Sequence, residues 1–271
     1  MRVLRPATTL TLCMLAAPAL AGPLLTPHRA VYDLSLNDAS DRSGITGVAG
    51  RMVYEFEGSR CDGYTVKFRF VTQIDTTEMS RLTDQQTTTY EDGEGKSFNF
   101  VTRSFIDQAL DREIKGRAVA SPTQTLVELE KPDPQEVVLD KTQFPTEHLL
   151  ELLGKAREGE RFYETTLFDG SDEADEVMTT TVIIGRPQAA EGDDQELAAL
   201  GGLRGDEVWP VDIAYFDMDD ASGEELPTYR ISFKLHPGGV TRDLVMDYGD
   251  FSLNGKLVDL AVFDPPKDCA D

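Results

Sequence analysis

The sequence is poor in the residues and motifs that usually carry out chemistry. Its 271 residues include three cysteines, three histidines and one tryptophan. It has no G-x-S-x-G elbow, no H-E-x-x-H motif, no glycine-rich phosphate loop and no C-x-x-C pair. The histidines, His28, His148 and His236, are well separated along the chain. No nucleophile or metal motif accompanies any of them, so an enzyme is the minority interpretation.

Basic residues are also scarce. The chain has 26 lysines and arginines against 49 aspartates and glutamates, which gives a formal net charge of −23. Such a surface repels nucleic acid and anionic membranes, so neither is an expected partner. Solubility is the simplest reason for this charge. The carboxylates are too numerous for any pair to be nominated for acid–base catalysis.

A run long enough to anchor the chain in a membrane is missing, but the N-terminus has the pattern of an export signal. Arg2 and Arg5 precede an apolar stretch over 10–20 that Pro18 interrupts. Ala19-Leu20-Ala21 is a small-x-small cleavage site. A membrane-spanning helix needs about 20 apolar residues, more than this stretch offers. The sequence therefore predicts a signal peptide over 1–21, a mature chain over 22–271 and a periplasmic location.

The cysteines fit an exported protein. Leu12 precedes Cys13, which argues against a lipidated cysteine, and Cys13 leaves with the signal. Cys61 and Cys269 remain, and two cysteines in an oxidising compartment predict one disulfide bond. Two buried free thiols are the alternative. A structural zinc site is less favoured, because two thiolates do not complete a four-coordinate shell.

The mature chain shows period-two alternation from its start. Apolar residues alternate with polar ones over 32–36, 52–57 and 64–70, which predicts three successive strands with one buried and one wet face. Further alternating segments follow to residue 263. Turn signals stand at 92–95 and 237–239, and Asn254-Gly255 is typical of a two-residue hairpin. We expect one all-β, mainly antiparallel domain over 22–271.

Only one segment has helical spacing. Leu149, Leu152, Leu153 and Ala156 form an apolar stripe within PTEHLLELLGKAREGE. Thr146 is the expected N-cap, Gly159 the expected stop, and His148 is expected at the surface or as a capping residue. The sequence predicts one main helix over about 146–157, packed against the sheet.

Two loops stand out between the predicted strands. In the acidic loop 169–176, Asp169, Ser171 and Glu173 match the start of a calcium-loop template, but Ala174 and Thr180 occupy its glycine and glutamate positions. An EF-hand is rejected, and an irregular calcium site stays open. The polar, glycine-rich segment 187–207 is predicted to be an insertion or a flap with a short helical turn around 196–200. The sequence predicts no metal site and no cofactor.

Several stretches together resemble one family. These are HRAVYDLSL, GRMVYEFEGSRCDGYT, FPTEHLLELL, FDGSD, WPVDIAYFD and the ending GGVTRDLVMDYGDFSLNGKL followed by a cysteine. They are similar to the cell envelope integrity protein EipB family of alphaproteobacteria, over about His28 to Cys269. The resemblance implies a periplasmic protein with a curved or spiral sheet of many strands. It also implies pairing of Cys61 with Cys269, and it brings no catalytic or ligand residues.

The functional hypothesis is a non-catalytic role in envelope integrity, through binding of an envelope component or a periplasmic protein. One alternative is a carrier whose curved sheet holds a lipid or an acyl chain. Another, less favoured, is a cell-wall glycan hydrolase, which would need two opposed carboxylates in a cleft.

Overall fold

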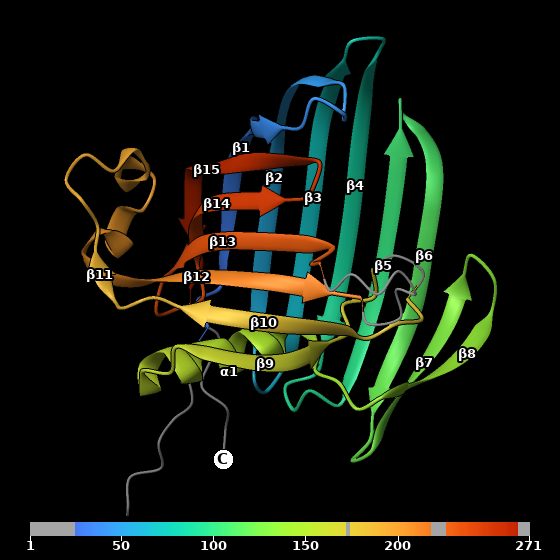
Figure 1. The fold of residues 1–271 in the computed structure, drawn as a ribbon. Coiled ribbons are helices and arrows are strands. Elements are labelled where there is room, and N and C mark those ends of the chain that lie inside the picture. Colours follow the sequence, from blue (N-terminus) through green and yellow to red (C-terminus); the bar gives the residue numbers. More distant parts are fainter. Residues whose placement is uncertain (1–24, 172–173, 218–225, 265–271) are drawn as a thin grey trace, which may run out of the picture.

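The computed structural model describes residues 25–171, 174–217 and 226–264 (Figure 1). The predicted signal peptide and Cys269 lie outside these residues. Within them, no helix is long and apolar enough to cross a membrane.

The described residues form one 15-stranded antiparallel sheet, one α-helix and two 3-10 helices. The strands are β1 His28–Ala39, β2 Ile45–Ser59, β3 Gly63–Thr76, β4 Ser80–Glu91, β5 Ser97–Ile106, β6 Ala109–Ala120, β7 Gln124–Lys131, β8 Gln135–Asp140, β9 Phe162–Leu167, β10 Met178–Ile184, β11 Gln188–Ala189, β12 Glu207–Phe216, β13 Tyr229–Leu235, β14 Thr241–Asp247 and β15 Phe251–Val262. The helices are α1 Pro145–Glu158, η1 Gln195–Ala198 and η2 Gly201–Gly205.

Hairpin connections build this sheet almost in sequence order. β1 to β8 form a continuous meander, and β9, β10, β12, β13, β14 and β15 form a second one, with β11 attached to β12. β15 returns to pair with β1, so β1 lies between β2 and β15. β8 and β9 are the two ends of the strand order, and β12–β15 lie in front of the first strands (Figure 1). The sheet is curved and unclosed, which confirms the predicted fold class.

Each strand presents alternate residues to two faces. We call the face that carries the buried Tyr32 and Met52 the inner face, and the opposite one the outer face. Asp33 and Arg51, next to them in sequence, form an ion pair on the outer face. Because the period of a strand is two, this separation follows directly from the alternation of apolar and polar residues.

The inner face buries two apolar cores. The larger joins β1 and β2 to β10 and β12–β15, with Leu152, Leu153 and Ala156 of α1 packed into it. The smaller lies under β5–β8 and includes Phe98, Phe100, Phe144, Phe168 and Val127. The predicted packing of the helix against the sheet is therefore confirmed.

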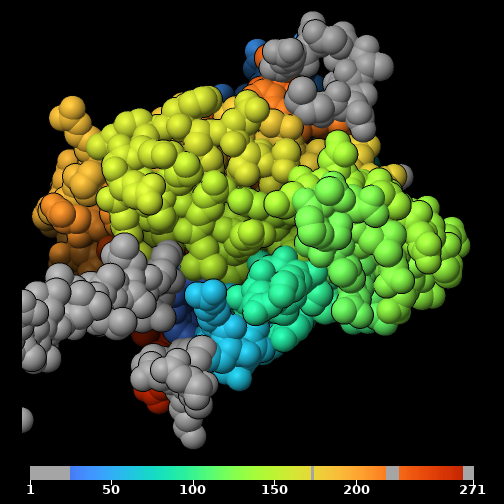
Figure 2. Space-filling view, turned by 90° about the horizontal axis from the view of Figure 1, so that it is seen from below, coloured from blue at the N-terminus to red at the C-terminus, as the bar shows by residue number. Residues whose placement is uncertain are grey.

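α1 closes the lower end of the sheet. Seen from below, the yellow-green segment of α1 and β9 covers the space between the β7–β8 hairpin and the later strands (Figure 2). The helix ends at Gly159, which adopts a left-handed conformation with φ of 81°, as predicted. Its start was predicted wrongly, because Pro145 is the first helical residue and Thr146 is not the N-cap.

The predicted hairpin at Asn254-Gly255 is also wrong. β15 runs unbroken through both residues, with Gly255 paired to Leu34 on one side and to Leu244 on the other. A Cβ atom at Gly255 would lie 3.1 Å from the side chain of Leu244. Glycine here allows two strands to approach closely and makes no turn.

Candidate functional site

The densest group of buried charges lies where the segment 187–207, which we call the strap, crosses the ends of β13–β15. Arg242 of β14 and His236 at the end of β13 have exposures of 0% and 1%, and Glu196 of η1 has 5%. Asp194 and Asp206 complete the group. We call these five residues the charge cluster. Buried ionisable groups are uncommon and often mark a functional or specifying site, so this cluster is the first candidate.

Alternation along β14 places the arginine inside. Arg242, Leu244 and Met246 are all buried, while Asp243 is exposed. The guanidinium therefore points to the side where the apolar residues of the strand point. An arginine in an inward position is the one sequence signal of this cluster, and the sequence analysis missed it.

Glu196 bridges a split in the sheet. The pairing of β14 with β15 begins at Leu244 and Gly255 and continues away from the strap. On the strap side of that point, the Glu196 carboxylate accepts the backbone N–H of Asp243 at 3.1 Å and that of Leu257 at 2.6 Å. Asp243 has a φ of 53°, a left-handed conformation that costs a non-glycine residue free energy. The carboxylate thus takes the place of strand-to-strand hydrogen bonds.

Arg242 fixes the position of the proton on His236. Its Nη1 donates to Asp194 and, at 3.4 Å, to Glu196. Its Nε donates to Nε2 of His236 at 3.3 Å, so that nitrogen must carry a lone pair. Nδ1 of His236 then carries the proton and donates it to Asp206 at 3.0 Å. The histidine is neutral, in a tautomer that both partners require.

The pKa shifts agree with this arrangement. Burial lowers the pKa of His236, and the nearby Arg242 adds to this, while Asp206 acts in the opposite direction. Burial raises the pKa of Glu196 more than its two backbone donors lower it. Burial also acts to raise the pKa of Asp194, but the N–H of Glu196 and the Arg242 guanidinium together hold it below its ordinary value.

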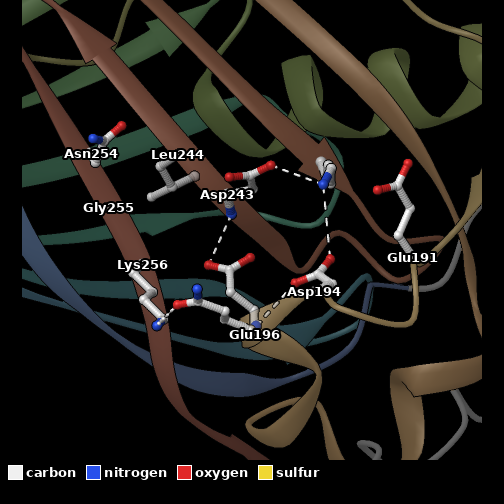
Figure 3. Close-up of a pocket in the computed structure, with 10 residues that line it drawn as sticks. Glu191, Asp194, Glu196, Asp243, Leu244, Asn254, Gly255 and Lys256 are labelled. Carbon is white, nitrogen blue, oxygen red and sulfur yellow. Dashed lines mark hydrogen bonds and ion pairs between the residues drawn. The ribbon is translucent and has the colours of Figure 1, made fainter. Parts of the chain in front are cut away.

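A hollow of about 300 Å³ lies beside the charge cluster, between the strap and β13–β15 (Figure 3). Its lining is Glu191, Asp194, Gln195, Glu196, Lys234, Asp243, Leu244, Asn254, Gly255 and Lys256. Lys234 pairs with Asp243 at 2.9 Å, and Nζ of Lys256 donates to Gln195 at 2.6 Å. The two lysines are therefore engaged by the chain itself. The bond of Lys256 to Gln195 and the 3.8 Å pair of Lys234 with Asp194 hold the strap on the sheet.

The strap is therefore packed against the sheet. Leu200 is buried in the larger core, and η1 provides the helical turn that the sequence predicts around 196–200. The predicted insertion is thus a segment with its own buried residues and its own hydrogen bonds to β14 and β15.

A second buried carboxylate caps α1. Glu91, at the end of β4, accepts the backbone N–H of Thr146 at 2.8 Å and that of Glu147 at 3.0 Å. The helix N-terminus therefore takes its cap from a residue far away in sequence, which the sequence analysis could not anticipate. Burial raises the pKa of Glu91 to about 7, although both amide donors act to lower it.

The three histidines lie in three different environments. His28 is buried, with Nδ1 2.7 Å from the carbonyl of Thr26. His148 is buried as well, with Nε2 3.4 Å from the hydroxyl of Thr180, so its predicted place at the surface or as a cap is wrong. Its side chain is covered because α1 turns that side of its first turn towards β10. His236 ends a strand as predicted, and it also belongs to the charge cluster.

The inner face carries aromatic rings that keep some exposed surface. Phe68 and Phe70 of β3 stack at 6.1 Å, and both are only partly buried. Across the larger core, the rings of Tyr215 and Tyr229 lie 5.5 Å apart and are also partly buried. Burial nevertheless raises the pKa of both tyrosines well above 10. These four residues therefore pack against the larger core and keep a minor part of their surface accessible.

The remaining residues that the sequence analysis names belong to the acidic loop and to the cysteine pair. In the acidic loop, Asp169 accepts the N–H of Ser171 at 2.9 Å, and Glu173 lies outside the described residues. No group of three or more His, Cys, Asp or Glu side chains in the described part of the chain could hold a metal ion. Cys61 lies in the turn between β2 and β3. Its predicted partner Cys269 is outside the described residues, so that pairing stays a prediction.

Comparisons with known proteins agree with the resemblance found in the sequence. The chain is 53% identical over 253 residues to the cell envelope integrity protein EipB of Brucella abortus (strain 2308). The aligned part covers 93% of this chain and 89% of that protein. A crystal structure of a β-barrel-like protein with a domain of unknown function from Brucella abortus has a TM-score of 0.87 and 53% identity, over 90% of this chain and 100% of that one. The family match spans residues 19–264, so the chain belongs to the EipB-like family.

Proposed function

We propose that this chain is a periplasmic protein that helps to maintain the cell envelope, by binding an envelope component or a periplasmic partner without a chemical step. The name of its relative supports the role in envelope integrity. The export signal predicted over 1–21 supports the location. The charge cluster supports a role without catalysis, because each of its side chains bonds to another member or to the backbone, and of its buried side-chain atoms only Nη2 of Arg242 has no partner within the described residues.

The observation that carries the proposal is the set of partly exposed aromatic rings on the inner face. Phe68 and Phe70 from one half of the sheet, and Tyr215 and Tyr229 from the other, point to the side of the larger core. Apolar surface that remains accessible inside a curved sheet favours binding of an apolar group. The bound part of the envelope component would then be an acyl or aromatic group.

The lipid or lipoprotein carrier is the second candidate, and the same rings favour it. A carrier and a structural binding protein would share this surface, and they differ in whether the ligand is released to an acceptor membrane. The hydrolase is not proposed. Asp194 and Glu196, the carboxylates that contact Arg242, both face this one arginine and do not oppose each other across a cleft.

Complementation tests the proposal. A strain that lacks its own relative of this protein is supplied with the wild type, with Phe70→Gln or with the control Arg69→Gln, and its growth is measured in detergent. Arg69 is the neighbour of Phe70 but lies on the outer face, where it pairs with Asp84. We expect Phe70→Gln to restore growth poorly and Arg69→Gln to restore it fully, at equal amounts of folded protein. Full restoration by Phe70→Gln would contradict the proposal.

A further inference from the structure

The outer face has a hollow of its own, separate from the charge cluster and from the inner face. It has a volume of about 610 Å³ and lies over β3–β7. Thr65, Tyr90, Asn99, Arg117 and Glu128 line it, one from each of the five strands. We call these five residues the outer row.

The outer row is a straight line across the sheet. Thr65 is directly opposite Tyr90, and Tyr90 is opposite Asn99. Asn99 is opposite Arg117, which is opposite Glu128. Four spacings between neighbouring strands make this line about 19 Å long. A chain-like ligand that crosses the strands could contact all five side chains in turn.

Charged neighbours on the outer face are matched by cross-strand partners. Lys67 pairs with Glu55 at 2.7 Å, and Arg103 pairs with Glu113 at 2.7 Å. Lys115, at the side of the hollow, pairs with Glu130. These pairs explain why the outer face tolerates so many charges.

Arg117 and Glu128 differ from those neighbours. They face each other across β6 and β7, both are exposed, and no ion pair joins them or links either one to another described residue. Asn99 and Thr65 likewise have no side-chain hydrogen bond within the described chain. The outer row therefore offers a cation, an anion, an amide and a hydroxyl that the protein leaves available.

Local backbone geometry opens the hollow and holds its aromatic residue. The register of β6 with β7 shifts between Lys115 and Gly116, and such a bulge bends and twists a strand. Tyr90 is 40% exposed, and its hydroxyl donates to the carbonyl of Asp62 at 3.1 Å. A Cβ atom at Gly63 would lie 2.5 Å from that hydroxyl, so glycine there is what admits the tyrosine ring. The ring is fixed beside the hollow before any ligand arrives.

We propose that this hollow binds an uncharged oligosaccharide. A fixed tyrosine ring offers an apolar face to a sugar ring, and the amide, hydroxyl, guanidinium and carboxylate groups suit hydroxyl and acetamido groups. The outer row carries one positive and one negative charge, so it favours neither a cationic nor an anionic ligand. The net charge of −23 on the whole chain disfavours an anionic ligand. The inference goes beyond the proposed function, since it adds a second binding surface, for a sugar, on the face opposite the partly exposed aromatic rings.

Calorimetric titration of the purified mature protein with the tetramer of N-acetylglucosamine tests this inference. We expect saturable binding that Tyr90→Ala and Asn99→Ala each weaken by about tenfold or more. Arg69→Ala is the matched control, because Arg69 lies on the outer face in a cross-strand pair with Asp84. It should leave the affinity unchanged. A tetramer of galacturonic acid, which carries carboxylates, should bind more weakly than the uncharged sugar.

Three outcomes would overturn the inference. The first is no heat of binding for any sugar up to about 10 mM, where even weak sites are populated. The second is binding that survives Tyr90→Ala and Asn99→Ala, and the third is stronger binding of an extended peptide than of the sugar. Each of these results would leave the proposed function standing, because the complementation test depends on the inner face and on Phe70.

Discussion

The Glu196 carboxylate accepts the backbone N–H of Leu257 at 2.6 Å and so joins the strap to β15 across 61 residues of sequence. The same carboxylate also accepts the N–H of Asp243. One side chain therefore completes the hydrogen bonding of two strands that have separated. The strap is consequently part of the folded sheet and should contribute to its stability.

Replacement of Glu196 tests this contribution. Glu196→Ala leaves two backbone N–H groups without their acceptor and Arg242 with one carboxylate fewer in a buried site. We expect a loss of about 3–5 kcal/mol in the free energy of unfolding, measured by urea titration. Glu191→Ala is the control, because Glu191 is exposed on the same strap, and it should change stability by less than about 0.5 kcal/mol. Equal effects of the two variants would contradict the bridging role.

Glu91 predicts a pH dependence. Burial raises its pKa from 4.5 to about 7 in the folded protein, so the folded state binds this proton more tightly than the unfolded state. The contribution of Glu91 to the free energy of unfolding therefore rises as the pH falls from 7 to 4.5, by about 3 kcal/mol at most. When the pH is lowered from 7.5 to 5.5, the free energy of unfolding of the wild type should increase relative to that of Glu91→Gln. The exposed Glu136→Gln variant should show no such relative change, and a constant difference between wild type and Glu91→Gln would refute the prediction.

Leu153 tests the packing of α1. Its side chain has 0% exposure within the larger core. Leu153→Ala should lower the free energy of unfolding by about 2–5 kcal/mol, as core truncations do. The half-buried Leu149, on the same helix, offers a comparison, and Leu149→Ala should cost less. An unchanged melting midpoint for Leu153→Ala would contradict the packing.

The disulfide between Cys61 and Cys269 is a prediction for the mature, exported protein. It would tie the β2–β3 turn to the C-terminal tail and close a loop of about 200 residues. The chain-entropy relation gives about 5 kcal/mol for such a loop. Peptide mapping without reductant should recover the two cysteines as one linked pair, and the double Cys→Ser variant should melt well below wild type. Recovery of both as free thiols would rule the bond out.

The sequence patterns predicted the strands and the helix well, because period-two and helical spacings report directly on burial. Asn254-Gly255 misled the prediction, since the same dipeptide that favours a turn also permits the close approach of β15 to Leu244. The contacts of Glu91 with Thr146 and of Glu196 with Leu257 join distant segments, and no local pattern encodes them. Arg242 is the exception, because its inward position in an alternating strand can be read from the sequence alone.

Native mass spectrometry of protein purified from the periplasm tests the central claim most directly. If the inner face binds the apolar part of an envelope component, wild type should carry a co-purifying molecule with an acyl or aromatic group. Phe70→Gln should carry much less of it, and Arg69→Gln should carry as much as wild type. The claim would be contradicted if wild type carried no such molecule, or if Phe70→Gln retained it in full.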